Sequence, residues 1–245
     1  MTSNRYMYGN RVAKFLIEQN SMESINKRLA KYFDILFVDE VQDFAANDFN
    51  FMIEISKATI DMLLVGDFYQ HTFDTSRDGN IRKNLHKNGS DAYLNEFKKV
   101  GIDIDTETLK KTHRCSPTIC EFISEKIGIS IQSNRIDETE VILVDDLKIA
   151  QGLFHDDSKV KLFFQEHTKY PCNSNNWGKC KGLNKYNDVC LVLNAKSAKY
   201  FKENRLEELP DSTRNKLYVA CSRARGDLYI MEEKHLKEFK VLDEG

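Results

Sequence analysis

Apolar runs of strand length alternate with helical patterns in the first part of the chain. Residues 33–38 form a nearly continuous apolar run that stops at Asp39 and Glu40. Residues 62–65 form a second apolar run, and residues 48–58 between the two runs have apolar positions at helical spacing. A strand, a helix and a second apolar strand in this order predict a parallel sheet whose strands are buried on both faces.

The same alternation continues to the end of the chain and predicts a second α/β half that starts near residue 110. Further strands are predicted at residues 141–144, 160–164, 189–193 and 228–231. Further helices are predicted at residues 12–29 with a break near residues 20–21, and at residues 91–100, 117–127 and 211–224. The helix that begins at Pro117 has clear boundary signals, because Ser116 can cap its first turn and Gly128 can end it.

The composition of the 245-residue chain is that of a globular protein, with 41% hydrophobic and 30% charged residues. The 36 basic and 38 acidic residues give a net charge of −2, which excludes a polybasic nucleic-acid tail and an acidic disordered chain. No apolar run is long enough to span a membrane, and the first residues lack the apolar core of a signal peptide. We therefore expect a cytoplasmic protein without a membrane partner.

The six cysteines are scattered along the chain and include no C-x-x-C pair. This usage indicates reduced thiols rather than a disulfide framework. His167, Cys172 and Cys180 offer groups that bind zinc, but their spacing fits no common zinc pattern. We do not expect a zinc site there.

Charge is unevenly distributed in the second half of the chain. Residues 137–157 carry seven acidic residues, and residues 169–205 carry eight basic ones, among them Lys179, Lys196 and Lys199. Two interpretations are equally open. The two segments can be ordinary solvated faces, or the basic segment can be a strip that binds a polyanion.

The most informative residues for chemistry follow the two predicted strands of the first half. Adjacent carboxylates such as Asp39 and Glu40 can divide two tasks, one binding Mg²⁺ and the other activating a water molecule. The alternative is that they cap a helix N-terminus. Gln70 follows the second strand closely, so it is expected at the same edge of the sheet. Two polar loops at one edge favour a ligand crevice over two helix caps.

Five segments, in order along the chain, resemble the conserved motifs of superfamily 1 helicases of the UvrD/Rep type. Residues 35–43 resemble motif II (Walker B), 65–70 motif III, 109–116 motif IV, 181–192 motif V and 217–224 motif VI. The resemblance implies an α/β protein with two RecA-like lobes of the P-loop-NTPase type, each with a parallel sheet. Lobe 1 would cover residues 1–107 and be truncated at its N-terminus, and lobe 2 would cover residues 108–245. The short distance from motif IV to motif V leaves no room for the 2B insertion of the family.

The resemblance also implies a role for each matching residue. Asp39 would bind Mg²⁺, Glu40 would be the catalytic base, and Gln70 would sense the γ-phosphate of ATP. Arg114 and Arg223 would be arginine fingers, which stabilise the charge on the transferring phosphoryl group.

Further residues would complete the nucleotide site and a path for nucleic acid. His113 stands where the family often has an aromatic that stacks on adenine, and Lys181 and Gly182 belong to motif V. ATP and Mg²⁺ would bind between the lobes, and single-stranded DNA would lie over both. Candidate DNA contacts are Phe73, Lys179, Lys196 and Lys199. Phe73 could equally be a core residue, and as a base-stacking residue it would contribute roughly 1–3 kcal/mol per base.

The sequence departs from the family in its phosphate-binding segment. The P-loop pattern G-x-x-x-x-G-K-[ST] is absent, and the nearest imitation, at residues 178–180, lacks the upstream glycine and the hydroxyl. Only 34 residues precede Ile35, which is short for the P-loop, its helix and motif Ia. Three interpretations are open: a C-terminal fragment of a helicase, a degenerate paralogue, or a P-loop supplied by another chain. Thr75 and Asn184 also replace an aromatic and a glutamate of the family motifs.

Two function hypotheses result. The first is a DNA-dependent ATPase and 3′→5′ helicase, or the C-terminal part of one. The second is a catalytically inactive helicase-like module that binds DNA or a partner protein, because losing the P-loop removes most of the grip on ATP. By analogy with compact relatives, either could serve DNA repair or an anti-phage system beside a nuclease partner.

Overall fold

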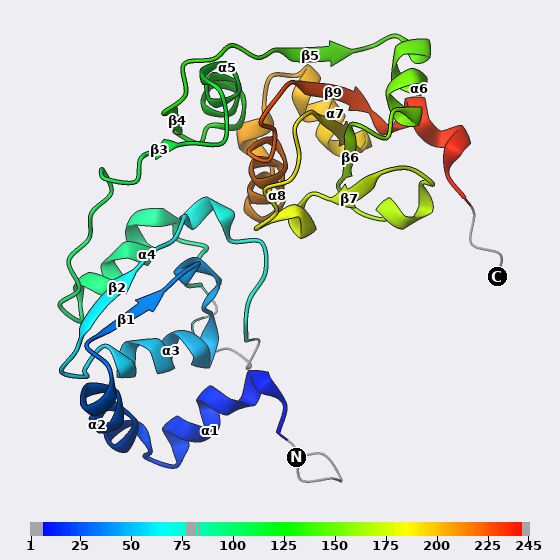
Figure 1. Ribbon diagram of the computed structural model, residues 1–245. Helices are drawn as coiled ribbons and strands as arrows, with labels where there is room; N and C mark the ends of the chain where they lie inside the picture. Colours follow the sequence, from blue (N-terminus) through cyan, green and yellow to red (C-terminus); the bar gives the residue numbers. More distant parts are fainter. Residues whose placement is uncertain (1–6, 77–81, 83, 242–245) are drawn as a thin grey trace. The chain divides into compact units, whose positions relative to one another are not determined.

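The computed structural model describes residues 7–76, 82 and 84–241, which belong to two compact units, Met1–Asp105 and Thr106–Gly245 (Figure 1). Both units are mixed α/β structures in which every strand pair is parallel within the described residues. The predicted α/β class with parallel sheets is therefore confirmed. In the described part of the chain, no helix has the length and apolar character needed to cross a bilayer.

The first unit contains a two-stranded sheet with helices before, between and after its strands (Figure 1). Its helices are α1 (Val12–Glu18), α2 (Met22–Tyr32), α3 (Ala46–Ile55) and α4 (Gly89–Lys98), its 3-10 turns η1 (Gly9–Arg11), η2 (Val41–Asp43) and η3 (Phe68–Gln70), and its strands β1 (Ile35–Val38) and β2 (Asp61–Leu64). The predicted break between α1 and α2 is confirmed, since Asn20 there has a φ of +53°.

The strands β1 and β2 pair in register, with Ile35 opposite Asp61 and Val38 opposite Leu64. Because the strands are parallel and α3 connects them, their carboxyl ends lie at the same edge of the sheet. The core of the unit packs α3 and α4 against one face of this sheet. Its buried members are Val41, Phe49, Met52, Ile53, Tyr93 and Phe97.

The prediction that these strands are buried on both faces is wrong. Burial alternates along both strands, and Ile35, Phe37 and Leu63 are 42%, 64% and 48% exposed. Side chains alternate between the faces of a sheet, and only the face that carries Val38 and Leu64 belongs to the core. An apolar run reports that a strand is compatible with burial, but it does not report how many layers cover it.

The second unit is built on a five-stranded parallel sheet in the order β5-β9-β8-β6-β7, with a separate short pair β3-β4. The strands are β3 (Lys111–Thr112), β4 (Gln132–Ser133), β5 (Val141–Val144), β6 (Val160–Phe163), β7 (Ser174–Asn176), β8 (Val189–Leu193) and β9 (Leu228–Glu232). The α-helices are α5 (Pro117–Phe122), α6 (Leu147–His155), α7 (Ala195–Lys202) and α8 (Asp211–Cys221). Short helical turns are η4 (Ile123–Ile127), η5 (His167–Lys169), η6 (Gly178–Cys180), η7 (Leu206–Glu208) and η8 (Glu233–Phe239).

Both faces of this larger sheet are covered. On one face, Cys190 and Val192 of β8 belong to a core cluster with Phe154 of α6 and Leu236 of η8. The alternate residues of β8 point to the other face, where α7 and α8 contact the strand. The predicted strands at residues 141–144 and 189–193 and the helix that starts after Ser116 are confirmed, and the Ser116 hydroxyl accepts the Ile119 N–H at 3.3 Å.

Two phenylalanines of the first unit test the one-sided burial of its sheet. Phe49 is fully buried and Phe37 is 64% exposed. We expect Phe49→Ala to lower the free energy of unfolding by about 3–5 kcal/mol, because it removes a buried ring. Phe37→Ala should change it by no more than about 0.5 kcal/mol, the usual range for surface substitutions. Urea titrations followed by circular dichroism measure both, and equal losses would mean that this face is covered in solution.

Candidate functional site

Asp39 and Glu40 follow β1 directly, and Asp67 follows β2 after two residues. Backbone hydrogen bonds continue past the strand ends, because Val65 N–H donates to Val38 O at 2.8 Å and Val41 N–H donates to Val65 O at 3.0 Å. The two loops therefore leave the sheet side by side at its carboxyl edge.

A chain of side-chain hydrogen bonds connects the two loops. Gln42 Nε2 donates to Glu40 Oε2 at 2.5 Å, and Gln42 Oε1 accepts the Asp67 N–H at 3.1 Å. Gln70 Nε2 in turn donates to Asp67 Oδ2 at 3.1 Å. Gln42 is completely buried, so its amide is held at the centre of this chain. The structure thus brings the predicted residues Glu40 and Gln70 into one network.

The backbone at Glu40 is unusual for a residue with a side chain. Its φ of 53° and ψ of 39° are left-handed, a conformation that costs L-residues roughly 1–2 kcal/mol. The Glu40 N–H donates to Asp39 Oδ1 at 2.8 Å, which helps to hold the turn. Strained backbone of this kind often occurs at functional sites.

Asp39 is exposed at the sheet edge, beside the network. Mg²⁺ is commonly bound by one or two carboxylates together with water and phosphate oxygens. The exposed carboxylate of Asp39 fits such an ion. Among the described residues, no loop carries the glycine-rich pattern that would hold the phosphates of a nucleotide.

Gly66 makes room for the buried amide. A Cβ at this position would lie 2.4 Å from Gln42 Oε1 and 2.8 Å from Val41 Cγ1, distances that real Cβ atoms do not reach. Only glycine therefore fits at position 66 while the side chain of Gln42 keeps its place.

In the second unit, two predicted arginines lie around the turn that follows α8. Arg114 Nη2 donates to Asn184 Oδ1 at 2.5 Å, and Arg114 Nη1 approaches Ser222 O at 3.5 Å. Arg223 Nη2 donates to the hydroxyl of the same Ser222 at 3.3 Å, and Arg223 Nε donates to Val219 O at 3.2 Å. Segments far apart in the sequence therefore bring two guanidinium groups to one loop.

The two arginines differ in accessibility. Arg223 is only 2% exposed, and burial, followed by the charge of Arg114, lowers the pKa of its guanidinium. Arg114 is half-buried. Two like charges in one place repel, and an anion bound beside them would relieve that repulsion.

Sequence reasoning missed two residues that hold these loops. Gln42 lies inside the motif II segment, where its position was a usable signal. Arg135 is an isolated arginine, and no sequence signal identifies it. Its Nη1 donates to the carbonyls of Arg114 and Arg225, the latter at 2.7 Å, and its Nε donates to Asp137 Oδ1 at 2.7 Å. Arg135 therefore fixes the backbone at Arg114 and at Arg225, two residues after Arg223.

The other predicted nucleotide residues lie in loops of the second unit. His113 is exposed, and both of its ring nitrogens lie 3.2 Å from Asn134 Nδ2. Lys181 follows η6 and is partly exposed. Gly182 has a φ of +76°, which favours glycine.

The predicted DNA contacts are exposed but lie on different elements. Phe73, in the first unit, is 50% exposed, so it is not a core residue. Lys179 lies on η6, whereas Lys196 and Lys199 lie one turn apart on α7. The structure places the two α7 lysines together, and it gives Lys179 a separate position.

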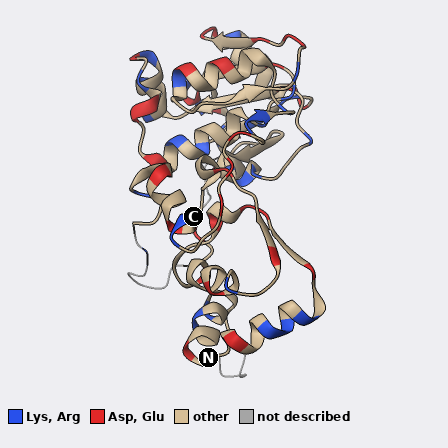
Figure 2. Ribbon diagram, turned by 90° about the vertical axis from the view of Figure 1, so that its left-hand side faces the viewer, with Lys and Arg blue, Asp and Glu red and all other residues tan. Residues whose placement is uncertain are grey.

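Acidic neighbours pair with four basic residues of the segment at residues 169–205. In the ribbon of Figure 2, stretches coloured as basic and as acidic residues alternate along the helices. The ion pairs are Lys169–Glu166 at 3.0 Å, Lys199–Glu203 at 3.9 Å, Lys202–Glu232 at 2.6 Å and Arg205–Glu208 at 2.6 Å. Within the described ranges, Lys179, Lys185 and Lys196 form no ion pair, so they are the lysines of this segment best placed to bind a polyanion.

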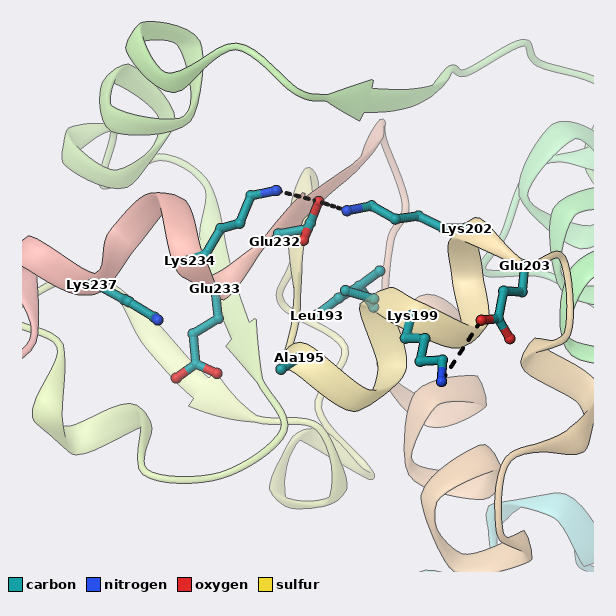
Figure 3. Close-up of a pocket in the computed structure, with 10 residues that line it drawn as sticks. Leu193, Ala195, Lys199, Lys202, Glu203, Glu232, Glu233, Lys234 and Lys237 are labelled. Carbon is teal, nitrogen blue, oxygen red and sulfur yellow. Dashed lines mark hydrogen bonds and ion pairs between the residues drawn. The ribbon is translucent and has the colours of Figure 1, made fainter.

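A pocket of about 490 Å³ lies where β8 and β9 end (Figure 3). Figure 3 shows Lys202 and Lys234 both directed at the carboxylate of Glu232, at 2.6 and 2.9 Å. Lys199 is the one predicted site residue in its lining. Arg223 comes before the start of β9, so the pocket and Arg223 lie at opposite ends of that strand.

Comparison with known protein families gives one match. The family model described as "Viral superfamily 1 RNA helicase core domain" matches residues 13–232. No curated protein matches the chain. The match covers most of the sequence and confirms the prediction of a superfamily 1 helicase, which indicates helicase-type activity on a nucleic acid. The chain therefore belongs to the viral superfamily 1 RNA helicase core domain family.

Proposed function

We propose that this chain provides the water-activating and arginine-bearing residues of a motor that couples ATP hydrolysis to movement along single-stranded nucleic acid. We predict DNA and a 3′→5′ direction, as in the UvrD/Rep-type helicases that the motifs resemble. In this proposal residues 1–107 and 108–245 are the two RecA-like lobes. The observation that carries the proposal is the hydrogen-bonded chain from Glu40 through the buried Gln42 to Asp67 and Gln70.

The first unit would act on water and on the metal. Asp39 would hold Mg²⁺, which neutralises charge on the phosphates when it is bound. Glu40 accepts a hydrogen bond from Gln42 through Oε2, and a carboxylate keeps further acceptor positions that can orient a water molecule and take its proton. The fixed turn at Glu40 limits the directions that this carboxylate can adopt.

Gln70 is suited to report the state of the nucleotide. It donates to Asp67, whose N–H donates to Gln42, whose amide donates to Glu40. A change at Gln70 can therefore alter the position of the Glu40 carboxylate through three hydrogen bonds. This is the link that a γ-phosphate sensor requires.

The second unit would supply positive charge. Arg114 is the accessible guanidinium and would contact the nucleotide. Arg223 is buried among its own neighbours, so it would reach a phosphate only after the loop at Ser222 moves. We also assign His113, Lys181 and Gly182 to the nucleotide side of this unit.

The phosphate cradle has to come from a segment other than those described. The pattern G-x-x-x-x-G-K-[ST] is absent from residues 1–245, and without it ATP loses the amides and the lysine that bind its β- and γ-phosphates. A P-loop-bearing chain or segment is therefore the partner that this proposal requires. The same absence favours the second candidate function, an inactive helicase-like module that binds nucleic acid or a protein such as a nuclease.

ATP hydrolysis in the presence of single-stranded DNA or RNA tests the proposal. We expect Glu40→Gln to lower the turnover number by about 10²–10⁴-fold, the contribution of a general base, and Arg114→Lys to lower it by about 10³–10⁵-fold, the contribution of an arginine finger. Glu23→Gln, at an exposed position of α2, is the matched control and should leave the rate unchanged.

The assay is run on the chain alone and then with a P-loop-bearing helicase half added. Turnover that depends on Glu40 in either case supports the motor. Absence of turnover in both, with nucleic-acid binding retained, would contradict it and support the inactive module. Stimulation by RNA but not DNA would correct the predicted substrate while leaving the motor in place.

Reversal of charge on α7 tests the proposed nucleic-acid contacts. We expect the double variant Lys196→Glu/Lys199→Glu to weaken binding of a labelled single strand. The slope of log K against log salt concentration should fall in magnitude by about 0.7 for each phosphate of the single strand that the variant no longer neutralises. The control is Lys27→Glu/Lys31→Glu on α2 of the first unit. Fluorescence anisotropy at several salt concentrations measures both, and an unchanged affinity would remove α7 from the binding surface.

A further inference from the structure

Three side chains with metal-binding groups meet in the first unit, next to the loop that follows η3. His71 and Asp74 come from this loop, and His86 comes from the segment before α4. One ligand atom from each lies within 4.8 Å of those of the other two. None of these residues has a part in the proposed hydrolysis.

The surroundings of His71 fix which ring nitrogen carries hydrogen. Nδ1 lies 2.9 Å from the carbonyl oxygen of Gln42, and a carbonyl only accepts, so Nδ1 is the donor. Nε2 lies 3.3 Å from Asp74 Oδ1. In neutral imidazole Nε2 then carries a lone pair, and a lone pair facing a carboxylate oxygen is repulsive. A cation, either a proton or a metal ion, has to lie between them.

His86 provides the third donor. Its Nε2 is buried and has no hydrogen-bond partner, which is costly for a polar atom. Its ring stacks on His71 with centroids 3.6 Å apart and planes 3° from parallel. A buried imidazole nitrogen without a partner can offer its lone pair to a metal ion.

We propose that His71, Asp74 and His86 bind a divalent first-row transition metal of the zinc type. Two imidazole nitrogens and a carboxylate oxygen suit zinc, whereas Mg²⁺ prefers an all-oxygen set. Zinc bonds of about 2.0–2.2 Å bring donor atoms closer together than 4.8 Å, so the side chains draw in on binding. One imidazole also turns out of the stack, because each lone pair lies in the plane of its ring.

His71 donates a hydrogen bond from Nδ1 to the carbonyl oxygen of Gln42. Metal-binding histidines commonly make such a bond with the ring nitrogen that does not bind the metal. It fixes the tautomer and the direction of the ring. The neighbouring Thr75 N–H also donates to Asp43 O at 3.1 Å, so the loop already runs beside the segment after β1. A bound ion would therefore join the loop after η3 to the segment before α4, and the His71 hydrogen bond already connects this loop to Gln42.

Zinc titration of the full chain tests this proposal. The protein is stripped with EDTA, exchanged into chelator-free buffer and titrated with Zn²⁺ by isothermal calorimetry. We expect one ion per chain. Asp74→Asn and His86→Gln should each weaken binding by at least about 10–100-fold, the loss found on removing even an outer-shell partner. His155→Gln, on α6 of the second unit, is the matched control and should bind as the parent does.

Circular dichroism of each variant keeps the test independent of folding. Asp74 is exposed, so Asp74→Asn should remain folded. If His86→Gln fails to fold, the zinc affinity of Asp74→Asn decides the outcome. The proposal is overturned if the parent protein takes up no Zn²⁺, or if all variants bind it equally. It is also overturned if nitrogen chemical shifts show His71 protonated at both ring nitrogens and unchanged by Zn²⁺, because His71 and Asp74 would then be an ion pair only.

Discussion

The buried amide of Gln42 determines how the first unit presents its polar loops. The amide donates to Glu40 and accepts from the Asp67 backbone, while the carbonyl of the same residue accepts from His71. Each such hydrogen bond contributes only about 0.5–1.5 kcal/mol net, but a buried group left without its partner costs about 1–3 kcal/mol. Because the contacts share one residue, they form or break together. A sheet of two short strands therefore keeps two loops in a single arrangement.

In the second unit, the loops are held in place by the sheet rather than by one buried side chain. Its central strands β6 and β8 are buried along their whole length, so the sheet itself holds the loops in place. Lys161 illustrates the constraint, because it lies fully buried in β6 and directs its ammonium group to the carbonyls of Asp156 and Lys159, at 2.9 and 3.0 Å. A charge in such a place needs partners, and the turn before the strand supplies them. Loop geometry in this unit follows from the packing of the sheet.

The sequence predicted the elements whose signals are local. Strand β8 is recognisable from its unbroken apolar run. The helix after Ser116 is recognisable from its capping residue and the proline that follows. Helices α6 and α7 were missed although Asp146 and Asn194 cap them, since α7 is rich in lysine and both helices are short. Their caps were the usable signal.

The candidate site was predictable only where residues belong to one motif. Asp39, Glu40 and Gln70 could be named because their segments follow apolar strands that end at one edge. The contacts of Arg135 span up to 90 positions, and His71 meets His86 without any periodic pattern between them. Such contacts depend on how whole segments pack, so they cannot be predicted from the individual residues.

The burial of Arg223 has a consequence for rates. A long side chain held in one rotamer loses up to about 2 kcal/mol of conformational entropy. For Arg223 this loss occurs when the second unit folds, because its guanidinium is already hydrogen-bonded to Val219 and Ser222. An anion that reached this group would find it already ordered, but the neighbours would first have to open. The rate at which an anion binds Arg223 would therefore be limited by how often these neighbours open. An anion enclosed there would be released only when they open again.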